Sequence, residues 1–154
     1  MITVLSPSPA LDVTYLVDGL EPGGIHRPRA VLRLAGGKGL NLARAARVLG
    51  EQVRVVAPLG GHIGSLVAEL AAAEGLDLEA RPSTGETRMC VSAIADDGSA
   101  TEFYEPAGVV EPFAFEAEWP VLAGSLHGSV AWAGSFRAVD TSGPGLAAVL
   151  DARP

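Results

Sequence analysis

The chain has 154 residues, a net charge of −7 and a single cysteine. This length is typical of one domain with a sizeable core. One cysteine excludes a disulfide framework and favours a reducing compartment, and no signal peptide or membrane-length apolar run is visible. An acidic chain also argues against nucleic acid as a partner. We therefore expect a cytoplasmic globular protein with neither a nucleic-acid nor a membrane partner.

The first segments predict a strand that leads into a ligand-facing loop. Residues 2–5 are apolar and are ended by Ser-Pro-Ser-Pro, as in a buried strand that enters a loop. Asp12 follows on the carboxyl side of this strand, where open α/β sheets bind ligands, although a turn residue would look the same. Residues 12–17 and 29–34 are also strand-like. Two extended segments before the first helix indicate a small sheet attached to the main body.

The segment 34–50 predicts an anion-binding helix start. Glycines flank Lys38 and open an amphipathic helix, whose expected apolar stripe is Leu42, Ala45, Ala46 and Leu49 and whose expected end is Gly50. Free N–H groups and the positive end of the helix dipole attract anions there, and glycines allow close approach. Lys38 adds a cation, and Asn41 adds an amide one turn into the helix.

The charge around this helix supports the same interpretation. Residues 22–50 contain no Asp or Glu, yet they hold six of the 11 basic residues: Arg27, Arg29, Arg33, Lys38, Arg44 and Arg47. Such an island suggests a small anion such as a phosphate ester, but a solvated helix face would have the same composition. The P-loop is excluded because Gly39 follows Lys38, and the dinucleotide motif is excluded because Leu42 replaces its last glycine.

The rest of the chain predicts an α/β alternation with one irregular junction. We expect a strand at 52–58, a helix at 65–74 and a hairpin of 88–95 and 100–105 around Asp97-Gly98. Arg88 could equally be a solvent-facing strand residue, and Cys90 a small half-buried one. Later elements are a helix at 113–126 kinked at Pro120, strands at 130–133 and 137–140, and a helix at 146–152. The last two strands lack the crossover that parallel neighbours need.

Several motifs in order give the chain a family resemblance. They are Pro9-Ala10-Leu11-Asp12, Gly36-Gly37-Lys38-Gly39-x-Asn41, Leu59-Gly60-Gly61-x-x-Gly64, Thr87-Arg88 and Gly134-Ser135. Together they resemble PfkB carbohydrate kinases of the ribokinase-like fold, most closely 1-phosphofructokinases and tagatose-6-phosphate kinases. The resemblance implies an α/β fold, a partial ribokinase-like parallel sheet with flanking helices plus a small β-sheet lid. Residues 1–154 would then form an incomplete kinase domain with lid segments at about 12–17, 29–34, 88–95 and 100–105.

The resemblance also implies a substrate site. Asp12 and Asn41 would hold sugar hydroxyls, while Gly37, Lys38 and Arg88 would hold the substrate phosphate with Ser135 nearby. The family reaction transfers a phosphoryl group from ATP, with Mg²⁺, to a hydroxyl of a sugar phosphate, for example from fructose 1-phosphate to fructose 1,6-bisphosphate. The lid of the family often pairs two subunits, which implies a homodimer here.

The chain departs from the family at several points. Ser8 and Cys90 replace asparagines that are common in the family, and Gly134-Ser135-Phe136 runs directly into Val139-Asp140-Thr141-Ser142-Gly143, as if a helix were deleted after Ser135. The Asn-x-x-Glu and Gly-Ala-Gly-Asp motifs, with the catalytic base, are absent from the 154 residues. We expect the substrate-binding half, inactive alone, or alternatively a sugar-phosphate-binding or subunit-pairing module. A nucleotide-dependent oxidoreductase is disfavoured by Leu42 and by the lid segments.

Overall fold

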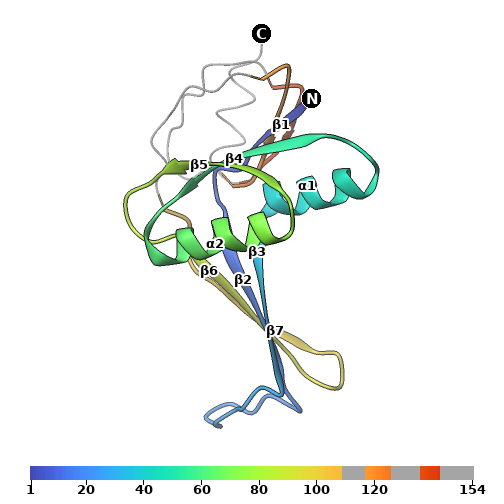
Figure 1. Cartoon of the computed structure of the whole chain (residues 1–154). Helices are drawn as coiled ribbons and strands as arrows, with labels where there is room; N and C mark the ends of the chain where they lie inside the picture. The colour runs from blue at the N-terminus through green and yellow to red at the C-terminus, as the bar shows by residue number, and fades with distance from the viewer. Residues whose placement is uncertain (109–116, 126–135, 143–154) are drawn as a thin grey trace.

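The fold consists of two separate sheets and two helices within the residues that the structure, a computed structural model, describes: 1–108, 117–125 and 136–142. One sheet is five-stranded and parallel, in the order β5-β4-β1-β8-β9. The other is four-stranded, in the order β3-β2-β6-β7. The second sheet projects away from the body of the molecule (Figure 1). This mixed α/β architecture is that of the ribokinase-like fold.

The element bounds follow the chain from the centre of the large sheet outward. They are β1 (Ile2–Leu5), β2 (Ala10–Leu16), β3 (Ala30–Gly36), α1 (Lys38–Val48), β4 (Val53–Leu59), α2 (Gly61–Ala73), β5 (Asp77–Pro82), β6 (Met89–Ile94), β7 (Ala100–Tyr104), β8 (Trp119–Ala123) and β9 (Ala138–Asp140).

The large sheet is built on β1, which is buried because both of its edges are paired. β4 lies on one side and β8 on the other, both parallel to it. Val4 and Leu5 of β1 and Val55 and Val56 of β4 are almost fully buried. Apolar runs of this kind are typical of parallel strands that are covered on both faces. The carboxyl ends of these strands therefore meet at one edge of the sheet, next to residues 6–9.

The small sheet is mixed, and its register decides which side chains share a face. β2 pairs antiparallel with β3 and parallel with β6, and β6 pairs antiparallel with β7. Directly opposite residues point the same way, so Leu34, Asp12, Cys90 and Tyr104 form one row. Leu11 and Val13 point to the other face and belong to the hydrophobic core. Asp12 therefore lies on the face that is turned away from the core.

Both helices end as their glycines predict. Gly50 has a φ of 87° and its N–H bonds to Arg47 O, while the N–H of Glu51 bonds to Ala46 O. This is a Schellman motif, and Gly75 ends α2 in the same way. The apolar stripe expected on α1 is wrong, however. Gly39, Leu40 and Ala43 are buried, whereas Leu49 is 81% exposed, because the sheet contacts the face offset from that stripe.

Three further expectations need correction. Helix α2 starts at Gly61, earlier than 65, because Glu86 supplies hydrogen-bond acceptors for its first N–H groups. Strand β5 was not expected because its sequence is polar, as suits an edge strand. The helix expected over 113–126 is wrong at 119–123: this segment is β8, since the open edge of β1 offers parallel pairing that overrides the helical pattern.

The junction near residue 137 also differs from its expected form. β9 pairs parallel with β8, and residues 124–137 connect them, which is long enough for a crossover of roughly a dozen residues. The strand expected at 130–133 and the helix expected at 146–152 lie outside the described residues. The deletion expected after Ser135 stays a prediction.

Candidate substrate-binding site

Asp12 is the acidic centre of the candidate site. Gly36 lies on the neighbouring strand, and a Cβ placed there would sit 2.1 Å from the Asp12 Cγ. The N–H of Gly37 donates to the Asp12 carboxylate. Burial raises the pKa of Asp12 above its ordinary value, while the Gly37 hydrogen bond and the positive charges of Arg44 and Arg88 oppose part of that shift. Two of the residues predicted for the site, Gly37 and Arg88, are therefore brought to Asp12.

The glycines that open α1 each fit a different neighbour. Gly37 has a φ of 98°, and a Cβ there would lie 2.9 Å from the Ser8 carbonyl oxygen. A Cβ on Gly39 would lie 2.4 Å from the Ser6 Cβ. The loop after β1 and the start of α1 are thus in backbone contact, which only glycine allows. This contact places the free N–H groups of a helix start beside Asp12.

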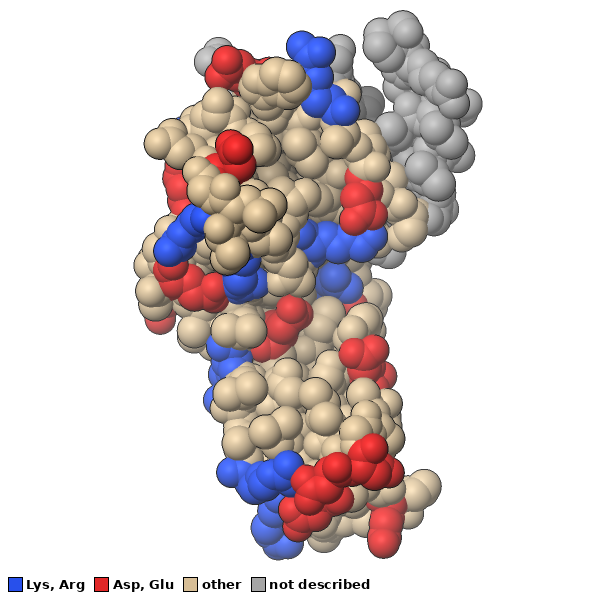
Figure 2. Space-filling model, turned by 90° about the vertical axis from the view of Figure 1, so that its right-hand side faces the viewer, with Lys and Arg blue, Asp and Glu red and all other residues tan. Residues whose placement is uncertain are grey.

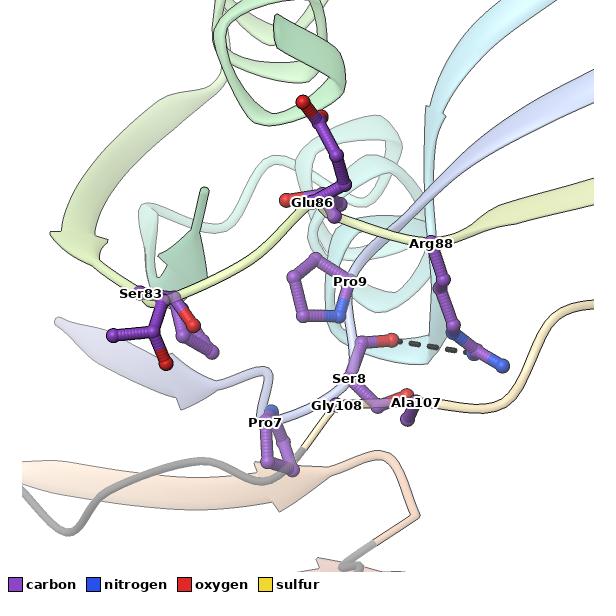
Figure 3. Close-up of a pocket in the computed structure, with 11 residues that line it drawn as sticks. Pro7, Ser8, Pro9, Ser83, Glu86, Arg88, Ala107 and Gly108 are labelled. Carbon is purple, nitrogen blue, oxygen red and sulfur yellow. Dashed lines mark hydrogen bonds between the residues drawn. The ribbon is translucent and has the colours of Figure 1, made fainter. Parts of the chain in front are cut away.

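Arg88 stands at the rim of a hollow at the carboxyl ends of the parallel strands. Its Nη1 donates to Glu105 O at 3.2 Å and its Nη2 to Ser8 O at 3.4 Å, the second bond being drawn in Figure 3. Its buried Nε has no partner among the described residues. The hollow is lined by Pro7, Ser8, Pro9, Pro58, Ser83, Thr84, Glu86, Thr87, Arg88, Ala107 and Gly108.

The second glycine motif is a seat for the segment that carries Arg88. Thr87 Oγ1 accepts from Gly60 N–H at 3.0 Å, and Thr87 N–H donates to Gly60 O. A Cβ on Gly61 would lie 2.2 Å from the Glu86 carboxylate, and one on Gly64 would lie 2.9 Å from Thr87 Oγ1. Residues 60–64 and 86–88, which are distant in sequence, therefore form one unit that fixes where Arg88 emerges.

The remaining predicted residues are not gathered around the hollow. Lys38 Nζ donates to Asp140 Oδ1 at 2.7 Å, and both side chains are about half exposed. Asn41 accepts from Arg44 Nη1 at 2.7 Å through its Oδ1. Neither Lys38 nor Asn41 lines the hollow, and Ser135 lies outside the described residues.

Sequence reasoning missed three features of this region. Arg44 lies between Asn41 and Glu74, and Asp140 pairs with Lys38. Gly124-Ser125 follows β8, where a Cβ on Gly124 would lie 3.1 Å from Pro7 Cδ and where Ser125 Oγ lies 3.0 Å from Ser142 Oγ. Only the last had a sequence signal: Gly-Ser occurs twice, and Gly124-Ser125 was not considered beside Gly134-Ser135.

Two buried hydroxyls mark the same edge of the sheet. Ser6 and Ser8 are at most 4% exposed, and their Oγ atoms have no hydrogen-bond partner among the described residues. A buried hydroxyl normally finds a partner, so a polar ligand or water suits this edge. Within the described ranges no group of three His, Cys, Asp or Glu side chains is placed to hold a metal ion, and no helix is long and apolar enough to span a membrane.

The basic island does not form one anion-binding surface. Arg29 pairs with Asp18 and Asp96, Lys38 with Asp140, and Arg44 with Glu74. Figure 2 shows blue and red side chains interspersed over the face in view. The cation available to Asp12 from outside the island, Arg88, comes from the segment 86–88. Composition therefore pointed to the right helix, but most of its positive charge is neutralised within the fold.

Solved structures share this fold. Phosphofructokinase-2 from Escherichia coli, in complex with fructose-6-phosphate, matches with a TM-score of 0.83 and 24% identity over 97% of this chain and 57% of that chain. A possible 1-phosphofructokinase from Thermotoga maritima matches with a TM-score of 0.75 and 16% identity over 97% of this chain and 56% of that chain. The chain thus spans a little over half the length of these structures.

The family is shown by a match that includes the whole candidate site. A model of the pfkB family carbohydrate kinases matches residues 8–127, which run from Ser8 through both glycine motifs and Arg88 to β8. With its motifs placed as the geometry above requires, the chain belongs to the pfkB family of carbohydrate kinases.

Proposed function

We propose that this chain binds a phosphorylated sugar at Asp12, Gly37 and Arg88, and that the sugar is the acceptor in an ATP-dependent phosphoryl transfer. The observation that carries this proposal is the Asp12 carboxylate, which accepts the Gly37 N–H at the start of α1 with Arg88 close enough to lower its pKa. An acid that accepts from sugar hydroxyls beside an arginine and a helix start provides both halves of a sugar-phosphate site.

The roles of the residues follow from their chemistry. Asp12 would accept from a sugar hydroxyl, and Asn41 would contact another. Arg88 and the N–H groups at Gly37 would hold the phosphate, while Lys38 would join them by exchanging its exposed partner Asp140 for the ligand. Ser135 keeps its place near the phosphate as a prediction only.

The acceptor that we propose is fructose 1-phosphate, with fructose 1,6-bisphosphate as the product. The similarity to a possible 1-phosphofructokinase and to a phosphofructokinase-2 in complex with fructose-6-phosphate supports a phosphorylated hexose. Kinases of this family use ATP and a metal ion. The described residues hold no acidic group suited to a metal, so we assign them to acceptor binding alone. For the 154 residues by themselves we propose binding without turnover.

A second proposal is that two copies pair through the small sheet. Leu32, Leu34 and Tyr104 are about half exposed, and they share the outward face of that sheet with Asp12. Apolar residues gathered on one exposed face are typical of an interface. One structural neighbour, phosphofructokinase-2 from Escherichia coli, has been solved as a tetrameric inhibited form, which supports an assembly in this chain.

Calorimetric titration with fructose 1-phosphate tests the binding proposal. We expect saturable binding that exceeds binding of fructose or inorganic phosphate. Arg88→Gln should weaken it by about 10- to 100-fold, because a charge-assisted contact is worth about 1.5–3 kcal/mol. Arg54→Gln is the matched control, since Arg54 forms an exposed pair with Asp77 on β4. Equal affinity for inorganic phosphate, or an unchanged affinity in Arg88→Gln, would refute the site.

A coupled assay of ADP release tests the second half of the proposal. With ATP, Mg²⁺ and fructose 1-phosphate present, the 154-residue chain should release no ADP above the background of Asp12→Ala. Sustained ADP release would show that these residues carry the complete kinase and would refute the view that they only bind the acceptor.

A further inference from the structure

Arg44 is the most fully bonded side chain near the candidate site. Its Nε and Nη2 both bond the Glu74 carboxylate, the Nη2–Oε1 distance being 2.8 Å. Its Nη2 also donates to Ala35 O, and its Nη1 donates to Asn41 Oδ1 at 2.7 Å. The side chain is only one-quarter exposed. A fork bonded in this way has one orientation, because the guanidinium is planar and its donors are fixed relative to one another.

The carboxylate that holds Arg44 is itself fixed by the end of α2. Glu74 is the C-cap residue of that helix, and the N–H groups of Gly75 and Leu76 close the Schellman turn directly after it. Arg47 Nη1 adds a bond to the Glu74 carbonyl oxygen at 2.5 Å. The orientation of Arg44 is therefore set by two helices and by the end of β3, and not by α1 alone.

This bonding limits what Asn41 can offer a ligand. The Asn41 side chain is exposed one turn into α1, and its amide oxygen is already taken by Arg44. Its Nδ2 hydrogens stay available as donors. At the same time the charge of Arg44 reaches Asp12. One arginine thus acts on both side chains that are proposed to contact sugar hydroxyls.

We propose that Arg44 is a positioning residue, which holds the Asn41 amide with its NH₂ group toward the ligand so that this position accepts only a hydrogen-bond acceptor. The inference rests on the proposed function for its ligand, but the orientation of Asn41 can be measured without any ligand. A purely structural role, in which Arg44 only joins α1 to α2, predicts a loss of stability with no dependence on Asn41.

A double-mutant cycle separates these two roles. Arg44→Gln should weaken fructose 1-phosphate binding about tenfold in the wild-type background and by less than about twofold in the Asn41→Ala background, since coupled residues are not additive. Arg47→Gln is the matched control, because it also contacts Glu74 but not Asn41, and it should leave the affinity within about twofold. Equal losses in both backgrounds, or no loss in Arg44→Gln, would overturn the proposal.

A ligand-free measurement keeps the inference separate from the proposed function. In the NMR spectrum, the Asn41 side-chain amide should be ordered in the wild type and in Arg47→Gln, and averaged in Arg44→Gln. If Arg44→Gln does not fold, Arg44→Lys replaces it, because a lysine keeps the charge but cannot span both Glu74 and Asn41. If the wild type binds no sugar phosphate, the proposed function fails, and the Asn41 amide alone decides: order independent of residue 44 overturns the role of Arg44.

Discussion

The Asp12 carboxylate occupies the space that a side chain at position 36 would need. Gly36 has no positive φ, so its backbone would accept any residue, and only the contact with Asp12 excludes one. The atoms in the way are the end of a side chain, which can rotate aside. A substitution at Gly36 should therefore disturb the function of Asp12 more than it disturbs the fold.

Gly36→Ala tests this separation of function from stability. The added methyl group should push the Asp12 carboxylate away from the Gly37 N–H and weaken fructose 1-phosphate binding about tenfold or more. The free energy of unfolding should fall by no more than about 1–2 kcal/mol, a common size for a tight core contact. Calorimetric titration and urea unfolding measure the two effects.

Gly19→Ala is the control for that substitution, because nothing lies within 4 Å of a Cβ placed there. It should leave both affinity and stability close to those of the wild type. Unfolding of Gly36→Ala at room temperature, or unchanged binding, would show that Asp12 is not held against Gly36.

Helix α2 borrows its N-terminal cap from another part of the chain. Its N-cap residue, Gly60, makes no side-chain cap bond. Glu86 accepts instead from the N–H groups of His62 at 3.1 Å and Ile63 at 3.0 Å. A carboxylate at this end of a helix satisfies free donors and complements the dipole. The same residue precedes Thr87 and Arg88, so the cap ties α2 to the candidate site.

The pH dependence of this cap has a definite sign. The Ile63 and His62 N–H bonds lower the pKa of Glu86, so the folded state favours the ionised carboxylate. Its contribution is present above the ordinary value of 4.5 and is lost as the pH falls through the lower pKa of the folded state. Glu86→Ala should therefore lower Tm by roughly 2–5 °C at pH 7 and by less at pH 3.

Glu69→Ala on the exposed side of α2 is the matched control for Glu86→Ala. Thermal unfolding followed by circular dichroism at both pH values provides the comparison. The cap would be discounted if Glu86→Ala and Glu69→Ala lowered Tm equally at pH 7, or if the effect of Glu86→Ala grew toward acid.

Elements with a strong local pattern could be predicted from the sequence, and elements defined by their neighbours could not. The hairpin around Asp97-Gly98 and the helix after Gly37 follow from turn chemistry and glycine placement, which act within a few residues. β5 and β8 exist because β4 and β1 offer free edges, and no local pattern in 77–82 or 119–123 records that.

The candidate site divides in the same way. Asp12, Gly37 and Arg88 belong to motifs whose spacing is visible in the sequence, and the structure brings them together. Arg44 and Asp140 owe their importance to partners that are 30 and 102 positions away in the chain, Glu74 and Lys38. Only the packing of α1 against α2 and β9 reveals them.

At the scale of the whole molecule, the small sheet has one covered face and one open face. The covered face carries Leu11 and Val13 into the core, with α2 packed against β2 and β3. The open face carries Asp12 together with exposed apolar residues. Ligand binding and subunit pairing, as proposed above, would therefore use the same surface.

Leu32→Glu tests pairing through this face. Leu32 is 53% exposed on β3, opposite Thr14, and a second copy seated there would bury its side chain. A buried unpaired carboxylate is strongly unfavourable, so the dimer dissociation constant should rise by at least about tenfold. Leu49→Glu is the control, because Leu49 is also exposed but lies at the end of α1, away from the small sheet. Sedimentation velocity over a range of concentrations should show wild type and Leu49→Glu as dimers and Leu32→Glu as a monomer; a wild-type monomer, or loss of the dimer in Leu49→Glu alone, would place the interface elsewhere or remove it.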